Sequence, residues 1–192
     1  MNNELKKIII FIGVILAVLS IYFGSLLPFA KSKTYINALN KMPSVKSLED
    51  FKNNFDVVFD FYSPVGDEET EKFLSSSILG IVSQKEQPEN VSRYLVEYIE
   101  PKLQKNNVRH LIMIGQMYMV LWQKSGKEED FVKAEEYYYQ ALSIGPKLPP
   151  VLYGLFDLYQ AKGDTAKIRE ISERILQLWP EDEKIKSLIT NY

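Results

Sequence analysis

Hydrophobic residues are spread unevenly along the 192-residue chain, and their longest uninterrupted stretch lies near the start. Ile8 to Phe29 is a run of 22 residues without a charged side chain, and 15 of them are Ile, Leu, Val or Phe. As an α-helix the run measures about 33 Å, against about 30 Å for the hydrocarbon core of a bilayer. The pattern therefore predicts a helix that can span a membrane.

Two interpretations of this run are open. Lys6 and Lys7 precede it, as in a secretory signal peptide, but the apolar core of such a peptide is about 7 to 15 residues long and ends in an A-x-A-like site. The best late site, Pro28-Phe29-Ala30, has proline where a small residue is required. We favour a retained membrane anchor over residues 1–30.

Small residues recur within the run at steps of four, three and four. They form one stripe on which a second membrane helix could pack closely, although lipid also tolerates them without any such partner. These residues are Gly13, Ala17, Ser20 and Gly24.

The charges that flank the run decide its expected orientation. Lys6 and Lys7 precede it, whereas Lys31, Lys33 and Lys41 follow it. Basic residues accumulate on the cytoplasmic side of a membrane helix. The near balance leaves a small preference for a cytoplasmic position of the residues that follow the anchor.

Between residues 31 and 105, apolar and polar residues alternate with the period of an α-helix. Ser47 and Asp50 form a capping-box start, after which apolar side chains fall on one helical face. A turn at 63–66 separates this helix from a second one, expected from Asp67 to about Gln84. Pro88 starts a third helix, whose apolar stripe is Val91, Leu95, Ile99 and Leu103.

In the last segment, residues 106–192, a residue pattern recurs after 34 positions, which is the spacing between Pro146 and Pro180. In its first copy Gly115, Ala134 and Ala141 are small where helices approach each other, and Tyr118 and Tyr138 fill the space between them. The chain between Tyr118 and Ala134 is seven residues longer than the usual unit, and the excess falls near QKSGKEED. We interpret it as a lengthened first helix and turn.

The second copy keeps the register but not every residue type. Leu152, Leu155, Tyr159, Gly163 and Pro180 stand in the expected places, whereas Ile168, Ser172 and Ile175 replace the usual small and aromatic residues. Asp164 or Thr165 is expected to cap its second helix. Residues 181–192 predict a closing helix with Ile185, Leu188 and Ile189 on one side.

Small and aromatic residues at these offsets, with a 34-residue period, resemble the tetratricopeptide (TPR) repeat. The expected fold is therefore all-α, an N-terminal transmembrane helix followed by a TPR-like helical-repeat (α-solenoid) domain. Residues 106–192 would form two repeats with a C-terminal capping helix. Because about three repeats are usually needed for stability, residues 31–105 are expected to pack on them as further helices.

In such a repeat array the first helix of each pair lines the inner face, which holds a protein partner. The modules that clamp a C-terminal carboxylate have Lys and Asn there. This chain has other residues at the matching places, so no carboxylate clamp is expected. The predicted groove residues are Arg109, Ile112, Gln116 and Met119 in the first unit, and Tyr153, Asp157 and Gln160 in the second.

Charge and motif content narrow the function further. Removing Glu4, Lys6 and Lys7 from the 25 acidic and 23 basic residues leaves 24 and 21, without a basic stripe, so nucleic acid is not an expected partner. The chain has no cysteine and one histidine, His110, and it lacks a Gly-rich phosphate loop and metal-binding motifs. We expect no catalytic site, no metal and no cofactor.

A second resemblance covers the whole chain, including SIYFGSLLPFAKSKTYINALNKMPS and GQMYMVLWQKSGKEEDFVKAEEYYYQ. These stretches resemble the tail that follows the last membrane helix in bacterial O-antigen ligase or polymerase-type membrane proteins. In that family a multi-pass membrane portion transfers the glycan, so the resemblance carries over no catalytic residue.

Two hypotheses follow. The chain is a membrane-anchored scaffold or adaptor that binds a protein, linked to envelope glycan assembly. Alternatively, it is an accessory subunit or split C-terminal fragment of a glycosyl-transferring complex, docked on a multi-pass glycan-assembly protein.

Overall fold

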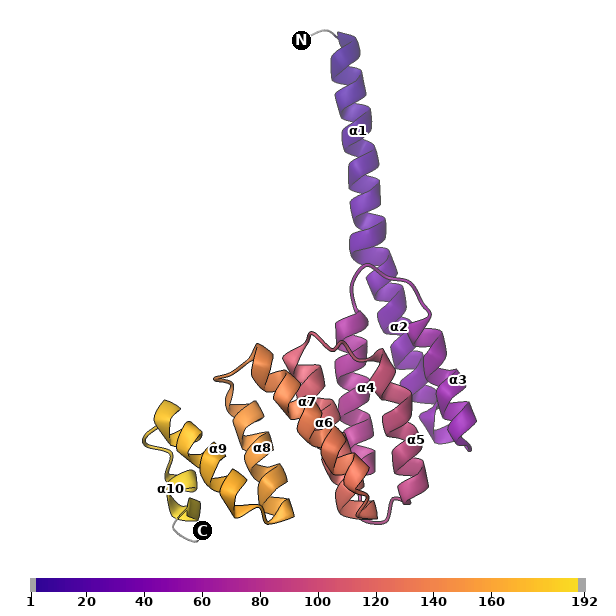
Figure 1. The fold of residues 1–192 in the computed structure, drawn as a ribbon. Coiled ribbons are helices and arrows are strands. Elements are labelled where there is room, and N and C mark those ends of the chain that lie inside the picture. Colours follow the sequence, from indigo (N-terminus) through magenta and orange to yellow (C-terminus); the bar gives the residue numbers. More distant parts are fainter. Residues whose placement is uncertain (1–2, 190–192) are drawn as a thin grey trace. The chain divides into compact units, whose positions relative to one another are not determined.

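The computed structural model describes residues 3 to 189, and between them it contains helices and no strand (Figure 1). The chain divides into two compact units, Met1–Leu74 and Ser75–Tyr192. These units cut the chain elsewhere than the predicted segments 1–30, 31–105 and 106–192. One reason is that the N-terminal helix continues through residue 30 without a break.

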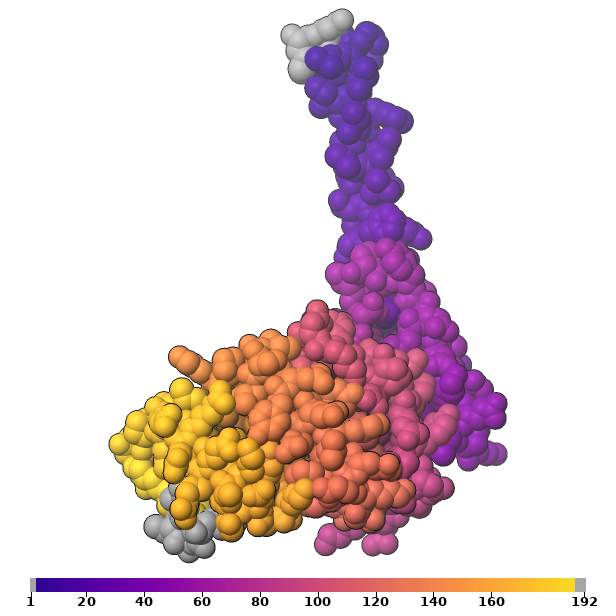
Figure 2. All heavy atoms as spheres, viewed as in Figure 1, coloured from indigo at the N-terminus to yellow at the C-terminus, as the bar shows by residue number. Residues whose placement is uncertain are grey.

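Unit 1 is built on that long helix. It consists of α1 (Asn3–Ile21), a π-helical turn η1 (Tyr22–Leu26), α2 (Leu27–Lys41) and a 3₁₀ turn η2 (Met42–Ser44). None of the residues of α1 is buried, and Figure 2 shows this indigo part with no other described segment of unit 1 packed on it. Helix Asn3–Ser44 is long and apolar enough to cross a membrane.

The rest of unit 1 packs on the lower half of that helix. Helix α3 (Leu48–Phe59) lies against α2, and Phe51, Phe55 and Val58 are its buried residues. The expected cap is present, because the Ser47 hydroxyl accepts from the Asp50 N–H at 3.0 Å. Helix α4 (Asp67–Val82) begins in unit 1 and ends in unit 2.

Unit 2 continues with α5 (Glu89–Ile99) and a 3₁₀ turn η3 (Glu100–Lys102). Pro88 is the N-cap of α5, as expected. The predicted stripe runs one position too far, since Leu103 lies beyond the helix in an extended conformation, although it is buried. Pro101 stands in the 3₁₀ turn that ends the helix, where its missing N–H costs no helical hydrogen bond.

Two helical hairpins follow. The first pairs α6 (Val108–Ser125) with α7 (Glu128–Ile144), and the second pairs α8 (Pro149–Lys162) with α9 (Thr165–Leu178). Each connection has two residues and begins with a glycine in the left-handed region, Gly126 at φ 70° and Gly163 at φ 76°. Pro146 and Pro180 both come two residues after a helix end, as the 34-residue repeat predicted.

The seven extra residues of the first hairpin lengthen both of its helices. Compared with the second hairpin, α6 runs four residues further past Tyr118 and α7 starts three residues earlier before Ala134, while the connection stays at two residues. The expected longer turn is therefore wrong, and the longer first helix is confirmed. The hairpin gains about one helical turn at its tip.

This lengthened tip makes polar contacts with the neighbouring helices. Arg93 of α5 binds the buried Asp130 carboxylate through two nitrogens, at 2.9 and 2.7 Å. Lys124 donates to the Gln84 and Gln87 carbonyl oxygens before α5. On the other side Lys162 of α8 pairs with Glu128 at 2.6 Å.

From α5 to α10 each helix contacts the next one, and α6 additionally packs on α8. The Tyr138 ring of α7 lies between these two helices. A Cβ atom at Gly115 of α6 would lie 3.1 Å from the ring, and one at Gly154 of α8 would lie 2.2 Å from it. Only a residue without a side chain lets α8 approach the ring this closely.

The chain ends on α10 (Glu183–Ile189), which packs on α9. The expected cap of α9 is present, since the Asp164 carboxylate accepts from the Lys167 N–H at 3.0 Å. Ile185 is buried and Leu188 is half-buried. The Ile189 side chain and residues 190–192 of the predicted closing helix lie outside the described residues.

Replacing Gly154 by Ala should lower the free energy of unfolding by about 1 to 3 kcal/mol, because the new methyl group overlaps the Tyr138 ring and forces α8 away from α7. Urea unfolding of the full chain in detergent, followed by far-UV circular dichroism, measures the change. Gly80→Ala is the matched control: Gly80 is exposed on α4 with no atom near its absent Cβ. It should raise stability by up to about 1 kcal/mol. Equal effects of the two substitutions would show that the Tyr138 contact is loose.

Candidate interaction surface

The four predicted groove residues of α6 form its accessible strip. Arg109 is exposed, and Ile112, Gln116 and Met119 are half-buried. They follow one another at steps of three or four, so they share one helical face. Six of the positions between them are buried in the core, whereas Met113 is half-buried; the six are His110, Leu111, Ile114, Gly115, Met117 and Tyr118.

The three predicted residues of α8 are accessible as well. Asp157 and Gln160 are exposed, and Tyr153 is half-buried. Because α6 and α8 pack on each other, the two strips lie on neighbouring helices. We call the seven residues together the α6/α8 strip.

The chain itself covers part of the α8 half of this strip. The Tyr153 hydroxyl donates to the Asp182 carboxylate, and the Lys184 ammonium lies 5.1 Å from the centre of the Tyr153 ring. Although Asp157 is exposed as a residue, partial desolvation of its carboxyl raises the pKa of this group, against the opposing effect of nearby Lys184. The connection from α9 to α10 therefore shields Tyr153, which a periodicity argument could not reveal. The place of Asp182 just before the closing helix was the available signal, because it caps α10 through the Ile185 N–H.

The α6 half is more open and chemically mixed. Arg109 stands in the first turn of α6, where the helix dipole disfavours a cation, so its position brings no local stabilisation. Asn107 caps this helix end by accepting from the Arg109 N–H at 3.0 Å. Beyond the guanidinium, the strip offers two apolar side chains and the Gln116 amide. Such a strip can bind a peptide that carries one acidic group next to apolar residues.

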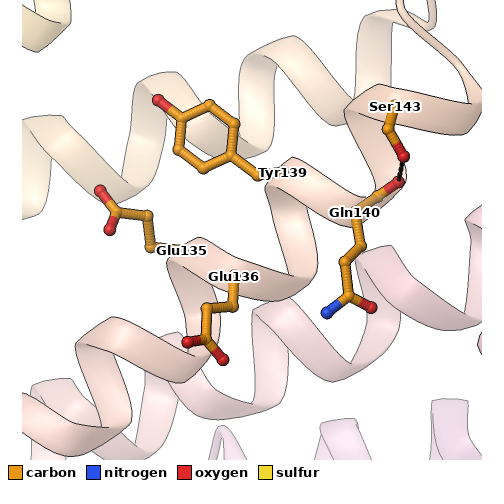
Figure 3. A pocket seen from close by; sticks show the side chains of 5 residues that line it. All are labelled: Glu135, Glu136, Tyr139, Gln140 and Ser143. Carbon is orange, nitrogen blue, oxygen red and sulfur yellow. Dashed lines mark hydrogen bonds between the residues drawn. The ribbon is translucent and has the colours of Figure 1, made fainter.

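A shallow hollow lies on a different helix, α7 (Figure 3). Its lining residues all come from that helix: Glu135, Glu136, Tyr139, Gln140 and Ser143. Two of its polar groups contact the second hairpin, since Tyr159 of α8 donates to Glu135 at 2.6 Å and its hydroxyl is 3.0 Å from that of Tyr139. Burial raises the pKa of Tyr159, and the hydrogen bond to Glu135 adds to this effect. The sequence pattern did not predict this hollow.

A partly buried polar network connects η3 with the first hairpin. Glu100 accepts from the Tyr118 hydroxyl at 2.5 Å and from the Tyr137 hydroxyl. Lys133 donates to Tyr118 at 3.0 Å, and Lys105 donates to Tyr137 at 2.9 Å. Burial opposes the ionisation of Glu100, but the two tyrosine hydrogen bonds and the two lysines outweigh it and lower the pKa of this carboxyl. Each hydroxyl and lysine in this network already has a partner, so the network stabilises the fold.

The fold also gives His110 a structural role. The side chain is buried, and its Nδ1 accepts a hydrogen bond from the Gln104 N–H at 3.1 Å. Among the described residues, no three His, Cys, Asp or Glu side chains gather as a metal site would require. The structure thus places His110 as a support for the connection before α6.

Comparison with protein-family models, with curated proteins and with solved structures gives no match to this chain. Its function therefore has to be argued from the geometry described above.

Replacing Glu100 by Gln should lower the free energy of unfolding at pH 7 by about 1.5 to 3 kcal/mol, the usual worth of hydrogen bonds to a charged group. The folded-state pKa of Glu100 lies below its unfolded value, so its contribution is present above the unfolded pKa and is lost as the pH falls through the folded pKa. The difference between wild type and Glu100→Gln should shrink over that acidic range. Urea unfolding at a series of pH values checks this, with the exposed Glu173→Gln on α9 as control. A pH-independent difference would contradict the ionised network.

Proposed function

We propose that this chain is a membrane-anchored TPR-type adaptor that binds a protein segment along the α6/α8 strip. The observation that carries the proposal is the packing of α6 on α8 with the Tyr138 ring between them. It brings the first helices of two successive hairpins side by side, as in a stacked helical-repeat array. Both helices then present accessible residues at the positions where such arrays bind their partners.

The two hairpins support the repeat assignment by their common plan. Both have a two-residue connection that begins with a left-handed glycine, and both are followed by a proline two residues after their second helix. The 34-residue spacing of these prolines is the TPR period. The first hairpin departs from the usual unit only by its longer tip.

The partner proposed for the strip is a protein segment with mixed side chains. Arg109 favours an acidic group, Ile112 and Met119 favour apolar ones, and Gln116 can hydrogen-bond a peptide backbone. The strip carries no lysine and asparagine pair for a terminal carboxylate, so an internal segment fits it better than a free C-terminus. No catalytic role is proposed for the chain.

The proposed location of the adaptor is a membrane, with α1 as a retained span. Its side chains are exposed along their whole length within unit 1, as lipid-facing residues would be. We propose that the residues following the span lie on the cytoplasmic side, in line with the small excess of lysine after the apolar run. A signal sequence near the N-terminus passes the same test of helix length and apolarity, so cleavage after residue 30 is the competing outcome.

The strip can be tested by photo-crosslinking in native membranes from a probe at Gln116. A probe at Glu136 tests the α7 hollow as the competing surface, and the exposed Glu173 on α9 serves as control. We expect a protein adduct, identified by mass spectrometry, from the Gln116 probe alone. With the probe kept at Gln116, Arg109→Glu should abolish the adduct without changing the unfolding midpoint, whereas Gln123→Arg, an exposed position on the same helix, should leave it intact. Adducts only from the Glu136 probe would move the binding surface to α7.

A second function is favoured by the small-residue stripe of the long helix. Gly13 and Gly24 have no described atom within 4 Å of the place of their absent Cβ, and Ala17 and Ser20 are exposed. The stripe is therefore free to dock on another membrane helix, as expected of an accessory subunit or split fragment of an O-antigen ligase/polymerase-type glycosyl-transferring complex.

Under this second function, Gly13→Ile and Gly24→Ile together should reduce co-purification with a multi-pass partner at least about tenfold, because bulky residues prevent close helix approach. Val14→Leu and Val18→Leu, which add volume beside the stripe, are the matched controls. The measurement is affinity purification from detergent-solubilised membranes with quantitative mass spectrometry. Unchanged recovery of every membrane protein would argue for the adaptor alone.

A further inference from the structure

The connection between α3 and α4 is tied to the start of α2 by a buried lysine. Lys31 is 1% exposed, and its ammonium donates to the Phe61 carbonyl oxygen at 3.0 Å and pairs with Asp67. Burying an ammonium is costly unless partners compensate it, so these contacts hold the connection against the helix. All of these residues belong to unit 1.

The connection has a defined shape. The Ser63 hydroxyl donates to the Val65 carbonyl oxygen at 2.6 Å, and the Thr70 hydroxyl donates to the Gly66 carbonyl oxygen at 2.9 Å. Gly66 has φ 103°, a conformation that side-chain-bearing residues rarely adopt. Within this tied connection Tyr62 and Val65 nevertheless point outward, with exposed fractions of 70% and 58%. The folding of unit 1 does not account for these two apolar side chains.

The exposure of Tyr62 and Val65 is explained by their position along the long helix. Lys31 follows the last residue of the apolar run, Phe29, by two positions. A helical side chain leans toward the N-terminus of its helix, so the Lys31 ammonium reaches back toward the run. Residues Asn3 to Leu26 are all exposed, whereas Leu27 and Pro28 are half-buried. The last turn of the apolar run is therefore covered on one side, at Leu27 and Pro28, whereas Phe29 is exposed, and the magenta-purple connection lies at this level in Figure 2.

This level corresponds to the surface layer of a bilayer. The layer between hydrocarbon and water is about 5 to 8 Å thick on each side, the length of about three to five helical residues. Leu27 to Lys31 occupy that length at the end of the run. Tyrosine is enriched at this depth, because its ring is apolar and its hydroxyl reaches polar headgroups.

We propose that Tyr62 and Val65 form a second membrane contact, which inserts into the surface layer of the bilayer that α1 crosses, with Lys31 setting the depth. The proposal rests on the retained anchor of the proposed function. The neighbouring Asp60, Asp67 and Glu68 are exposed and acidic, so the contact is apolar and does not depend on anionic headgroups. A helix held at one point can tilt and rotate in lipid, and this contact fixes both for unit 1.

The test uses the absence of cysteine from the chain. Val65→Cys is labelled with a fluorophore, and the full chain is reconstituted in phosphatidylcholine vesicles that contain lipids with a nitroxide near the headgroup. Ile12→Cys reports on the anchor, and the exposed Lys46→Cys, beyond the far end of α2, is the control. The Val65 probe should lose roughly half of its emission, because nitroxide and probe then share a layer only about 5 to 8 Å thick. The Lys46 probe should keep its emission.

Further variants and lipid mixtures distinguish a failure of the second contact from a failure of the anchor. In the Val65-labelled chain Tyr62→Ser should weaken the quenching, Tyr62→Phe should retain it, and added phosphatidylglycerol should not increase it. Quenching at Ile12 with equal, weak quenching at Val65 and Lys46 would overturn the second contact and leave the anchor standing. Loss of quenching at Ile12, measured with nitroxides placed deep in the acyl chains, would overturn both. Quenching at Val65 only with phosphatidylglycerol would overturn the apolar contact.

Discussion

The close approach of α8 to the Tyr138 ring is the contact on which unit 2 depends. A single helical hairpin cannot bury its apolar face, so each hairpin needs a neighbour to cover it. Gly115 of α6 and Gly154 of α8 let these two helices approach the Tyr138 ring closely, and Tyr138 is almost completely buried as a result. Burial also raises the pKa of its hydroxyl, so the ring stays neutral in the interior. The same contact brings α6 and α8 side by side and so creates the α6/α8 strip.

The lengthened tip of the first hairpin shows how a departure from a repeat can be used structurally. An additional helical turn places Asp130 and Lys124 within reach of the helices before the hairpin, and Glu128 within reach of Lys162 after it. Asp130 is buried, yet hydrogen bonds from Arg93 and Ser125 outweigh the effect of burial and lower its pKa. The tip therefore joins α5, α6, α7 and α8 by charged contacts, while Tyr138 joins the helices by packing.

Unit 1 combines the long apolar helix with a small helical support. The helical segment runs from Asn3 to Ser44, and its polar half, α2, packs on α3. Lys31 then attaches the α3–α4 connection at the end of the apolar run. In the proposed setting, the anchor is thereby a rigid part of unit 1 and differs from a flexible tether, since tilt is decided by contacts at the membrane surface.

The sequence alone determined the helical class, the apolar run, the cap at Ser47 and the helix ends before Pro146 and Pro180, and it limited the cap of α9 to Asp164 or Thr165. These features depend on periodicity and on short-range hydrogen bonds, so residues close together in the sequence are enough to specify them. Only the tertiary structure decided that the seven extra residues lengthen two helices, that Asp182 shields Tyr153, and that Lys31 is buried against Phe61 and Asp67. Each of these contacts joins residues about 30 or more positions apart or depends on a neighbouring helix. Local pattern carries no information about such distances, because they arise only when the helices pack.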